Sequence, residues 1–206
     1  NHITIIPTLR AILEDDDLRL DGFIGPGHVS MIIGTEGYDF IAKKHGKPFV
    51  VAGFEPLDIL QSVWMLLQQF REQRCEVENQ YKRVVPTHGN AAALAAMEEV
   101  FRVREQFEWR GLGSIPESGV EMRAEFAAFD AEKVFAMPDI PVVDPAECQC
   151  GEVLKGRLKP WQCQVFGKAC TPDQPLGALM VSSEGACAAY YNYGSQWRER
   201  AEEVSA

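Results

Sequence analysis

Cysteine and proline are concentrated in the last third of this 206-residue chain. Five of the six cysteines and six of the 12 prolines follow Met137, whereas Cys75 stands alone. A segment rich in both residues has few continuous apolar runs, so a bound group or a cross-link is needed to hold it together. The sequence therefore predicts an α/β domain over residues 1–137 and a small Cys-rich domain over 138–206 that ends in a helix.

Four of the clustered cysteines have the spacing C-x12-C-x6-C-x16-C; they are Cys150, Cys163, Cys170 and Cys187. Four thiolates suit either structural Zn²⁺ or a [4Fe–4S] cluster. Zinc sites usually take their thiolates in close pairs, so this wide spacing favours iron–sulfur. Buried inert thiols and disulfides stay open as alternatives. Cys148 lies two residues before Cys150 and is expected to be a bystander.

The first 137 residues alternate strand-like and helix-like stretches. Strands are expected at 21–25, 48–53, 77–85 and 107–115, and helices at 29–45, 55–73, 90–103 and 124–135. The third of these helices has Asn90 as its expected N-cap, and the second has an apolar face through Leu57, Leu60, Trp64 and Leu67. This β-α-β-α order predicts a parallel, Rossmann-like sheet with flanking helices.

Bulk composition excludes some classes of partner. The formal net charge of −10 argues against a nucleic-acid groove, which needs clustered Lys and Arg. No apolar run is long enough to span a bilayer, and the opening residues do not have the pattern of a signal peptide. We therefore expect a cytoplasmic protein that binds neither membrane nor nucleic acid. Because the chain starts without Met, we also expect it to be a piece of a longer protein.

The loops that follow the first two expected strands carry polar residues. In open parallel sheets ligands collect at the carboxyl ends of strands, which would be "GPGHVS" (25–30) and "AGFEPLD" (52–58). His28, Glu55 and Asp58 are thus functional candidates, although the two acids also suit an ordinary helix start. Glu184 is either a helix-start acid behind a Ser cap or a polar group beside the metal site. As a phosphate loop, "GPGHVS" departs from the dinucleotide fingerprint at its third glycine.

Several longer motifs resemble one known family. The stretches "GPGHVSMIIGT", "VVAGFEPLDIL", "VENQYKRVV", "EWRGLG", "CGEVLKG" and "GALMVSSEGACAAYY" occur in an order similar to that of the hydrogenase maturation factors of the HypD family. The resemblance covers nearly the whole chain and corresponds to about the C-terminal half, or slightly more, of a family member. An independent α/β module stabilised by zinc is the alternative that remains.

The resemblance implies a specific function and site. It implies an iron–sulfur scaffold that helps assemble the Fe(CN)₂CO unit of [NiFe]-hydrogenases, acting with a HypC-type chaperone and a HypE-type cyanide donor rather than as a classical enzyme. It also implies that the cluster ligands are the four spaced cysteines and that the motif His and Glu of the family correspond to His28 and Glu184. The family's N-terminal half carries further cysteines for which this chain has no counterpart, so part of the scaffold site is expected to be missing.

Overall fold

The computed structural model describes residues 4–109, 111–135 and 145–194, and these residues divide into two compact units. The first unit contains residues up to 14, 20–105 and 116–135, and the second contains 15–19, 106–115 and the Cys-rich segment. The boundary predicted between 137 and 138 falls at residues 136–144, outside the described residues, and stays a prediction. Each unit is described by itself below.

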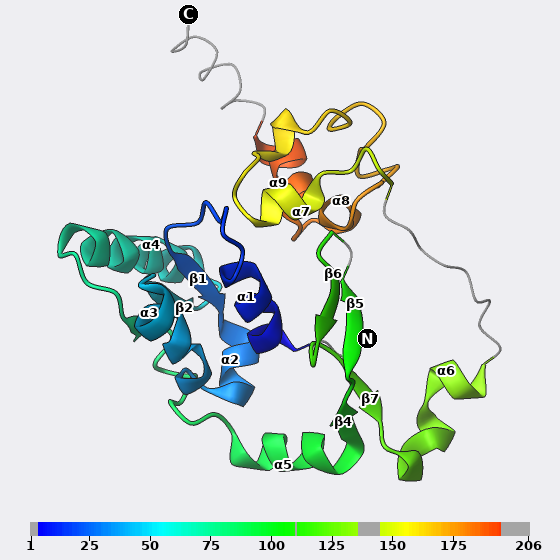
Figure 1. The fold of residues 1–206 in the computed structure, drawn as a ribbon. Helices are drawn as coiled ribbons and strands as arrows, with labels where there is room; N and C mark the ends of the chain where they lie inside the picture. The colour runs from blue at the N-terminus through cyan, green and yellow to red at the C-terminus, as the bar shows by residue number, and fades with distance from the viewer. Residues whose placement is uncertain (1–3, 110, 136–144, 195–206) are drawn as a thin grey trace, which may run out of the picture. The chain divides into compact units, whose positions relative to one another are not determined.

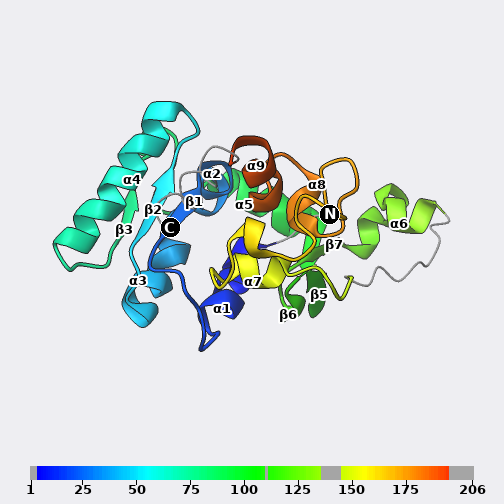
Figure 2. The same ribbon diagram turned by 90° about the horizontal axis from the view of Figure 1, so that it is seen from above.

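The first unit is built on a three-stranded parallel sheet with the order β1-β2-β3 (Figure 1). Its elements are α1 (Ile5–Leu13), β1 (Phe23–Pro26), α2 (Gly27–Ile33), η1 (Glu36–Tyr38), α3 (Asp39–His45), β2 (Phe49–Ala52), α4 (Pro56–Arg71), β3 (Val77–Asn79), α5 (Ala91–Val100), β4 (Phe101–Val103), β7 (Val120–Met122), η2 (Ala124–Phe129) and α6 (Ala131–Val134). Strands β4 and β7 form a separate antiparallel pair. Figure 2 shows α3 and α4 separated by the strands.

The predicted α/β class and parallel sheet are confirmed. In the register, Phe23 lies beside Phe49, and Phe49 lies beside Val77. All four residues of β2 are buried, as expected for a central strand with helices on its faces. The Phe49 ring stacks on the buried Tyr38 ring, with their centroids 4.5 Å apart, and this pair forms the centre of the core.

Helix boundaries follow local signals where these are strong. Asn90 caps α5 as predicted, because its Oδ1 accepts the Ala93 N–H at 3.0 Å. The helix expected over 29–45 is instead split into α2, η1 and α3, with Gly34 at a φ of 79° in the break. The helix expected over 124–135 divides into η2 and α6, because Asp130 adopts an extended conformation and caps α6.

Helix α4 packs with its polar side inward. Its buried residues are Asp58, Ser62, Leu66 and Gln69, which share one helical face. The predicted apolar face exists, but it is exposed: the exposed fractions are 78% for Leu57, 66% for Leu60, 58% for Trp64 and 59% for Leu67. Apolar spacing therefore identified the helix but not the side that it buries.

The Cys-rich unit consists of short elements joined by turns. They are β5 (Gln106–Trp109), β6 (Gly113–Pro116, of which Pro116 falls in the first unit), α7 (Cys150–Leu154), η3 (Pro160–Gln162), α8 (Ala178–Val181) and α9 (Ala186–Tyr193). The predicted C-terminal helix is confirmed as α9. The strand expected over 107–115 is instead the two-stranded β5–β6 sheet, with a turn in which Gly111 has a φ of 83°.

Residues 15–19 join this unit through an ion-pair network. Asp15 pairs with Lys155, whose Nζ lies 2.8 Å from Oδ2, and with the Arg157 guanidinium. The Arg19 N–H also donates to the Lys155 carbonyl at 3.0 Å. This network holds an acidic turn, distant in sequence, against the end of α7.

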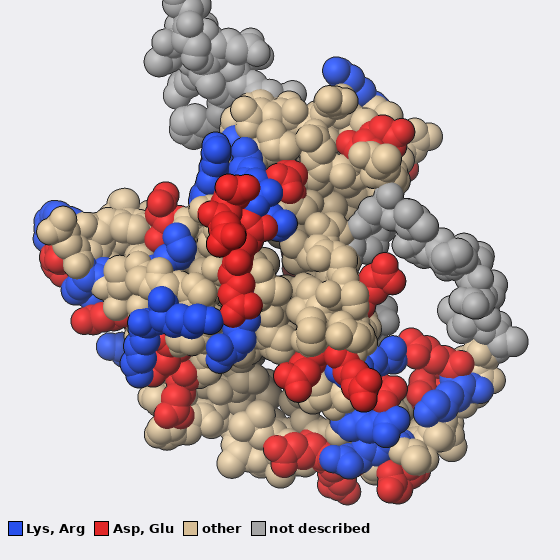
Figure 3. Space-filling view, viewed as in Figure 1, with Lys and Arg blue, Asp and Glu red and all other residues tan. Residues whose placement is uncertain are grey.

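Charged side chains are interspersed on the face drawn in Figure 3, where Lys and Arg alternate with Asp and Glu. The prediction that no nucleic acid binds is not tested by this observation. Among the described residues, no helix is long and apolar enough to cross a membrane.

Candidate metal centre and strand-end loops

All five cysteines of the Cys-rich unit lie near one another. Cys150 begins α7, Cys163 follows η3, Cys170 lies in the loop that leads towards α8, and Cys187 is in the first turn of α9. Cys163, Cys170 and Cys187 pack in one cluster with Met180 of α8, and the Sγ atoms of Cys148 and Cys150 both lie beside Gly177, the residue before α8. The fold thus brings together the four residues predicted from spacing, and Cys148 with them.

Two glycines make room for the sulfur atoms. A Cβ atom on Gly177 would lie 2.2 Å from the Cys148 Sγ and 3.7 Å from the Cys150 Sγ. A Cβ atom on Gly111 would lie only 2.5 Å from the Cys150 Sγ. A side chain at Gly177 would therefore force the Cys148 thiol to move, and one at Gly111 would force the Cys150 thiol to move.

Apolar side chains surround one side of the thiol group. Cys170 and Cys187 are buried with Phe166, Met180 and Ala188, and Cys163 packs against this cluster. Burial, followed by the nearby thiols, raises the pKa of Cys187 to about 12. A thiol in such surroundings stays protonated and inert unless a cation stabilises the thiolate.

The donor set is chemically suited to a metal group. None of the six cysteines, all of which are described, forms a disulfide. Thiolates are the ligands of iron–sulfur clusters and of many structural zinc ions. In the part of the chain that the structure describes, no three His, Cys, Asp or Glu side chains are already spaced to hold a single metal ion. Binding would require the thiols to turn towards a common centre.

Glu184 lies in the turn between α8 and α9, three residues before Cys187. Its side chain is exposed, and Gly185 rather than a serine occupies the N-cap position of α9. Ser182 instead ends α8. The interpretation of Glu184 as a first-turn acid behind a Ser cap is therefore wrong. Its position just before a buried thiol keeps it a candidate beside the metal centre.

In the first unit, one aromatic ring follows each strand of the parallel sheet. His28 comes after β1, Phe54 after β2 and Tyr81 after β3. The His28 and Phe54 rings stack with centroids 3.9 Å apart, and Phe54 meets Tyr81 edge-on at 6.5 Å. The Arg83 guanidinium lies over the Tyr81 ring, 4.5 Å from its centroid. The sheet thus presents an aromatic row at its carboxyl edge, with His28 exposed at one end.

Asp58 is held in a dense hydrogen-bond network. Arg83 pairs with it bidentately, Nη1 to Oδ1 at 2.9 Å and Nη2 to Oδ2 at 2.6 Å, and Gln80 donates to Oδ1 at 2.8 Å. These donors, Arg83 first, hold the pKa of Asp58 well below its ordinary value. The Glu55 N–H also donates to Oδ2 at 3.4 Å. Asp58 therefore ties the turn after β3 to the start of α4, where Glu55 is the N-cap residue.

Packing explains the glycines of "GPGHVS". A Cβ atom on Gly25 would enter the Phe49 ring, and one on Gly27 would collide with the Ala52 carbonyl oxygen. These glycines let β1 and α2 lie close to β2. Their presence needs no phosphate ligand to account for it.

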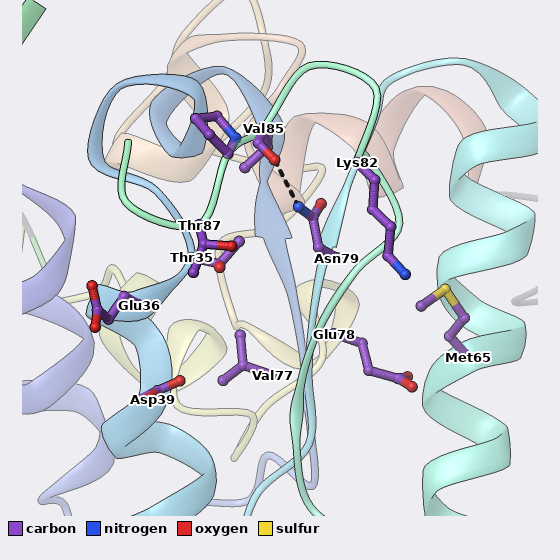
Figure 4. A pocket seen from close by; sticks show the side chains of 11 residues that line it. Thr35, Glu36, Asp39, Met65, Val77, Glu78, Asn79, Lys82, Val85 and Thr87 are labelled. Carbon is purple, nitrogen blue, oxygen red and sulfur yellow. Dashed lines mark hydrogen bonds between the residues drawn. The ribbon is translucent and has the colours of Figure 1, made fainter. Parts of the chain in front are cut away.

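A polar hollow of about 620 Å³ lies elsewhere in this unit. Figure 4 shows its labelled lining, with Asn79 donating to the Val85 carbonyl at 2.9 Å; the other labelled residues include Thr35, Glu36, Asp39, Met65, Glu78, Lys82 and Thr87. Among its described lining residues are none of the candidates that the sequence singled out.

Sequence reasoning missed Phe54, Tyr81 and Arg83. Tyr81 and Arg83 were placed inside a strand expected over 77–85, but β3 ends at Asn79 and a turn follows. The available signal was that Phe54 directly follows the second apolar run, as His28 follows the first. Residues in these positions meet at one edge of a parallel sheet.

Comparison with known proteins places the chain in a family. Residues 1–194 match the HypD family model, described as the hydrogenase formation hypA family. The hydrogenase maturation factor HypD of Rhodobacter capsulatus is 59% identical over 198 residues, and that of Escherichia coli K12 is 54% identical over 198 residues. The hydrogenase expression/formation protein HupD of Azotobacter chroococcum is 49% identical over 210 residues.

These alignments cover 94%, 96% and 100% of this chain but only 52%, 53% and 55% of the three relatives. The chain thus spans about half the length of the curated relatives that it matches. Both the extent of the family match and the level of identity are far beyond what a shared fold alone would produce. The chain belongs to the HypD family of hydrogenase maturation factors.

Proposed function

We propose that this chain is the iron–sulfur-binding part of a hydrogenase maturation scaffold. In this proposal Cys150, Cys163, Cys170 and Cys187 hold a [4Fe–4S] cluster, and the protein acts in the cytoplasm, where thiols remain reduced. The observation that carries the proposal is that Cys163, Cys170 and Cys187 pack in one cluster of a unit with little apolar core, with Cys150 buried beside Gly177 at the start of α8.

The cluster would supply reversible one-electron chemistry, and the protein would hold it and limit the access of water. Phe166, Met180 and Ala188 form an apolar wall beside Cys170 and Cys187, which shields this side from solvent. Gly111 keeps side-chain bulk away from the Cys150 Sγ, and Gly177 keeps it away from the Cys148 Sγ. With four protein thiolates the group has no open position, so electron relay suits it better than substrate binding.

Metal analysis after anaerobic purification tests the cluster directly. The proposal predicts about four irons and four sulfides per chain, with absorbance at about 400 nm that bleaches on reduction. A chain with stoichiometric zinc and no such absorbance would instead be the zinc-stabilised interaction module. That module would unfold on chelation without showing redox activity.

The proposed partners are a HypC-type chaperone and a HypE-type cyanide donor, with the Fe(CN)₂CO unit held transiently between this protein and the chaperone. The family membership supports this proposal. Because the chain spans about half of its relatives, maturation is to be tested in the full-length protein of the relative from Rhodobacter capsulatus, altered at the residue aligned with Cys163. Replacement by Ser should abolish hydrogenase maturation.

His28 is proposed to contribute to the scaffold or partner surface, since it is an exposed ring at the carboxyl edge of the sheet. Replacing it with Ala should lower maturation while changing the free energy of unfolding by less than about 0.5 kcal/mol, as is usual for exposed positions. Replacing the exposed His88, which pairs with Glu36 away from this edge, is the matched control. Normal hydrogenase maturation with the His28→Ala variant would show that His28 has only a structural role.

A further inference from the structure

The thiol group contains one cysteine more than a four-thiolate site requires. Cys148 was expected to be a bystander because it lies only two residues from Cys150, too close for both to serve one regular site. Instead, its Sγ occupies the space beside Gly177 that also borders the Cys150 Sγ. The two sulfur atoms are therefore neighbours next to α8.

The other three thiols lie together on the apolar side. Cys163, Cys170 and Cys187 belong to the cluster that contains Phe166 and Met180, whereas neither member of the Cys148–Cys150 pair does. Three positions of the proposed four-thiolate site are thus given to these three cysteines. For the fourth position two neighbouring residues are available, Cys148 and Cys150.

The residue before Cys148 also contacts a thiol of the apolar cluster. The Cys163 Sγ lies 4.0 Å from the carbonyl oxygen of Glu147. Cys148 is partly exposed, whereas Cys150 is buried with 4% of its surface accessible. A bond from Cys150 to the metal centre would therefore be better shielded from solvent than a bond from Cys148.

We infer that Cys148 is a reserve ligand of the metal centre, able to take the fourth position in place of Cys150. This inference rests on the proposed iron–sulfur site. The exchange is a substitution at iron: the bond to one thiolate breaks and that sulfur takes up a proton, while the other thiol loses a proton and bonds. No oxidant or reductant is consumed. By exchanging Cys150 for Cys148 as its ligand, the metal centre can become more exposed to solvent without losing iron.

Four forms of this chain, purified anaerobically, test the inference: wild type, Cys148→Ser, Cys150→Ser and the double variant. Iron and sulfide should be unchanged in Cys148→Ser, and Cys150→Ser should keep more than about half of the wild-type iron, whereas the double variant should keep about a tenth or less. Cys170→Ser is the control, because Cys170 is buried in the apolar cluster to which Cys148 does not belong, and it should match the double variant.

Alkylation followed by mass spectrometry gives a second readout that does not depend on the amount of iron. Iodoacetamide should modify Cys148 in the iron-loaded wild type and leave it protected in iron-loaded Cys150→Ser. If Cys150→Ser loses iron as completely as the double variant, while wild type retains it, the inference is wrong and the iron–sulfur proposal stands. If the wild-type chain itself binds no iron, both the inference and the iron–sulfur proposal are wrong. Circular dichroism of each variant separates loss of iron from loss of fold.

Discussion

At the scale of single residues, each functional candidate is defined by its contacts. Asp58 was a candidate because of its place at a strand end, yet both of its oxygens are engaged by Arg83, with further donors from Gln80 and Glu55. Such a carboxylate holds a turn in place and has little freedom to bind a ligand. His28, in contrast, has an exposed side chain that stacks on the Phe54 ring and on no other ring of the described residues, so its other face remains available.

The ion pair between Asp58 and Arg83 should make a pH-dependent contribution to the stability of the folded state. The pKa of Asp58 is lowered on folding, so this residue stabilises the folded state above its unfolded pKa of about 3.8, and this stabilisation is lost as the pH falls further towards the folded value. Asp58→Asn should therefore lower the melting temperature at pH 7, and the gap to wild type should narrow below about pH 4. Asp39→Asn, which removes an exposed pair with Lys43, should change little. A gap that is constant from neutral pH to pH 3 would contradict this assignment.

Replacement of Gly177 by alanine should have a local effect on the neighbouring thiol. The Gly177 φ of −106° suits any residue, so alanine there adds no backbone strain, but its Cβ would lie 2.2 Å from the Cys148 Sγ and force that sulfur to move, whereas the Cys150 Sγ at 3.7 Å would stay in ordinary contact. Gly177→Ala should change the rate at which iodoacetamide modifies Cys148 and leave the iron content and the secondary structure intact. Gly37→Ala, whose Cβ would make only ordinary contact with Ile6, should leave that rate at the wild-type value. Equal rates in both variants would show that Gly177 does not confine the Cys148 thiol.

At the scale of secondary-structure elements, α4 shows how a helix can bury its polar face. The Ser62 hydroxyl donates to the Asp58 carbonyl, and the Gln69 amide bonds to Glu78 and to the Glu76 N–H. These bonds satisfy the side chains of Ser62 and Gln69, so burying these two residues does not carry the usual penalty. The apolar row through Leu60 and Trp64 is left at the surface.

Neighbouring leucines on α4 test this orientation. Leu66 has 9% of its surface exposed, whereas Leu67 has 59%. Leu66→Ala should lower the free energy of unfolding by about 2–4 kcal/mol because it leaves a cavity, and Leu67→Ala should lower it by less than about 1 kcal/mol. Urea titrations of both variants measure the difference. If the two costs were reversed, α4 would have to pack by its apolar face.

The elements that could be predicted from sequence are those with strong local signals. The buried run of β2 and the Asn90 cap of α5 are of this kind. The inward side of α4 was not predictable, because it depends on partners such as Arg83 and Glu78 that come from distant segments. The sequence predicted Cys150, Cys163, Cys170 and Cys187 as metal ligands, and that role stays a prediction. It did not predict the contact of Cys148 with Gly177, which depends on the turn before α7.

At the scale of the whole molecule, the two units rely on different sources of stability. The first has an ordinary core around Tyr38, Ile41 and Phe49. The second has short helices around three thiols and a few apolar side chains, together with the Asp15 ion-pair network. A bound metal group stabilises the unit that binds it, in proportion to its affinity for the folded state. Removal of the metal should therefore destabilise the Cys-rich unit and leave the parallel sheet folded.

The central claim, that the gathered thiols hold a four-iron cluster, is most directly tested by Mössbauer spectroscopy of the chain produced with ⁵⁷Fe and purified without oxygen. The account predicts that nearly all the iron gives the spectrum of a [4Fe–4S] cluster with complete thiolate ligation, and that this signal is lost in the Cys163→Ser chain. Iron present only as isolated thiolate-bound ions, or a wild-type chain that carries zinc and no cluster signal, would contradict it.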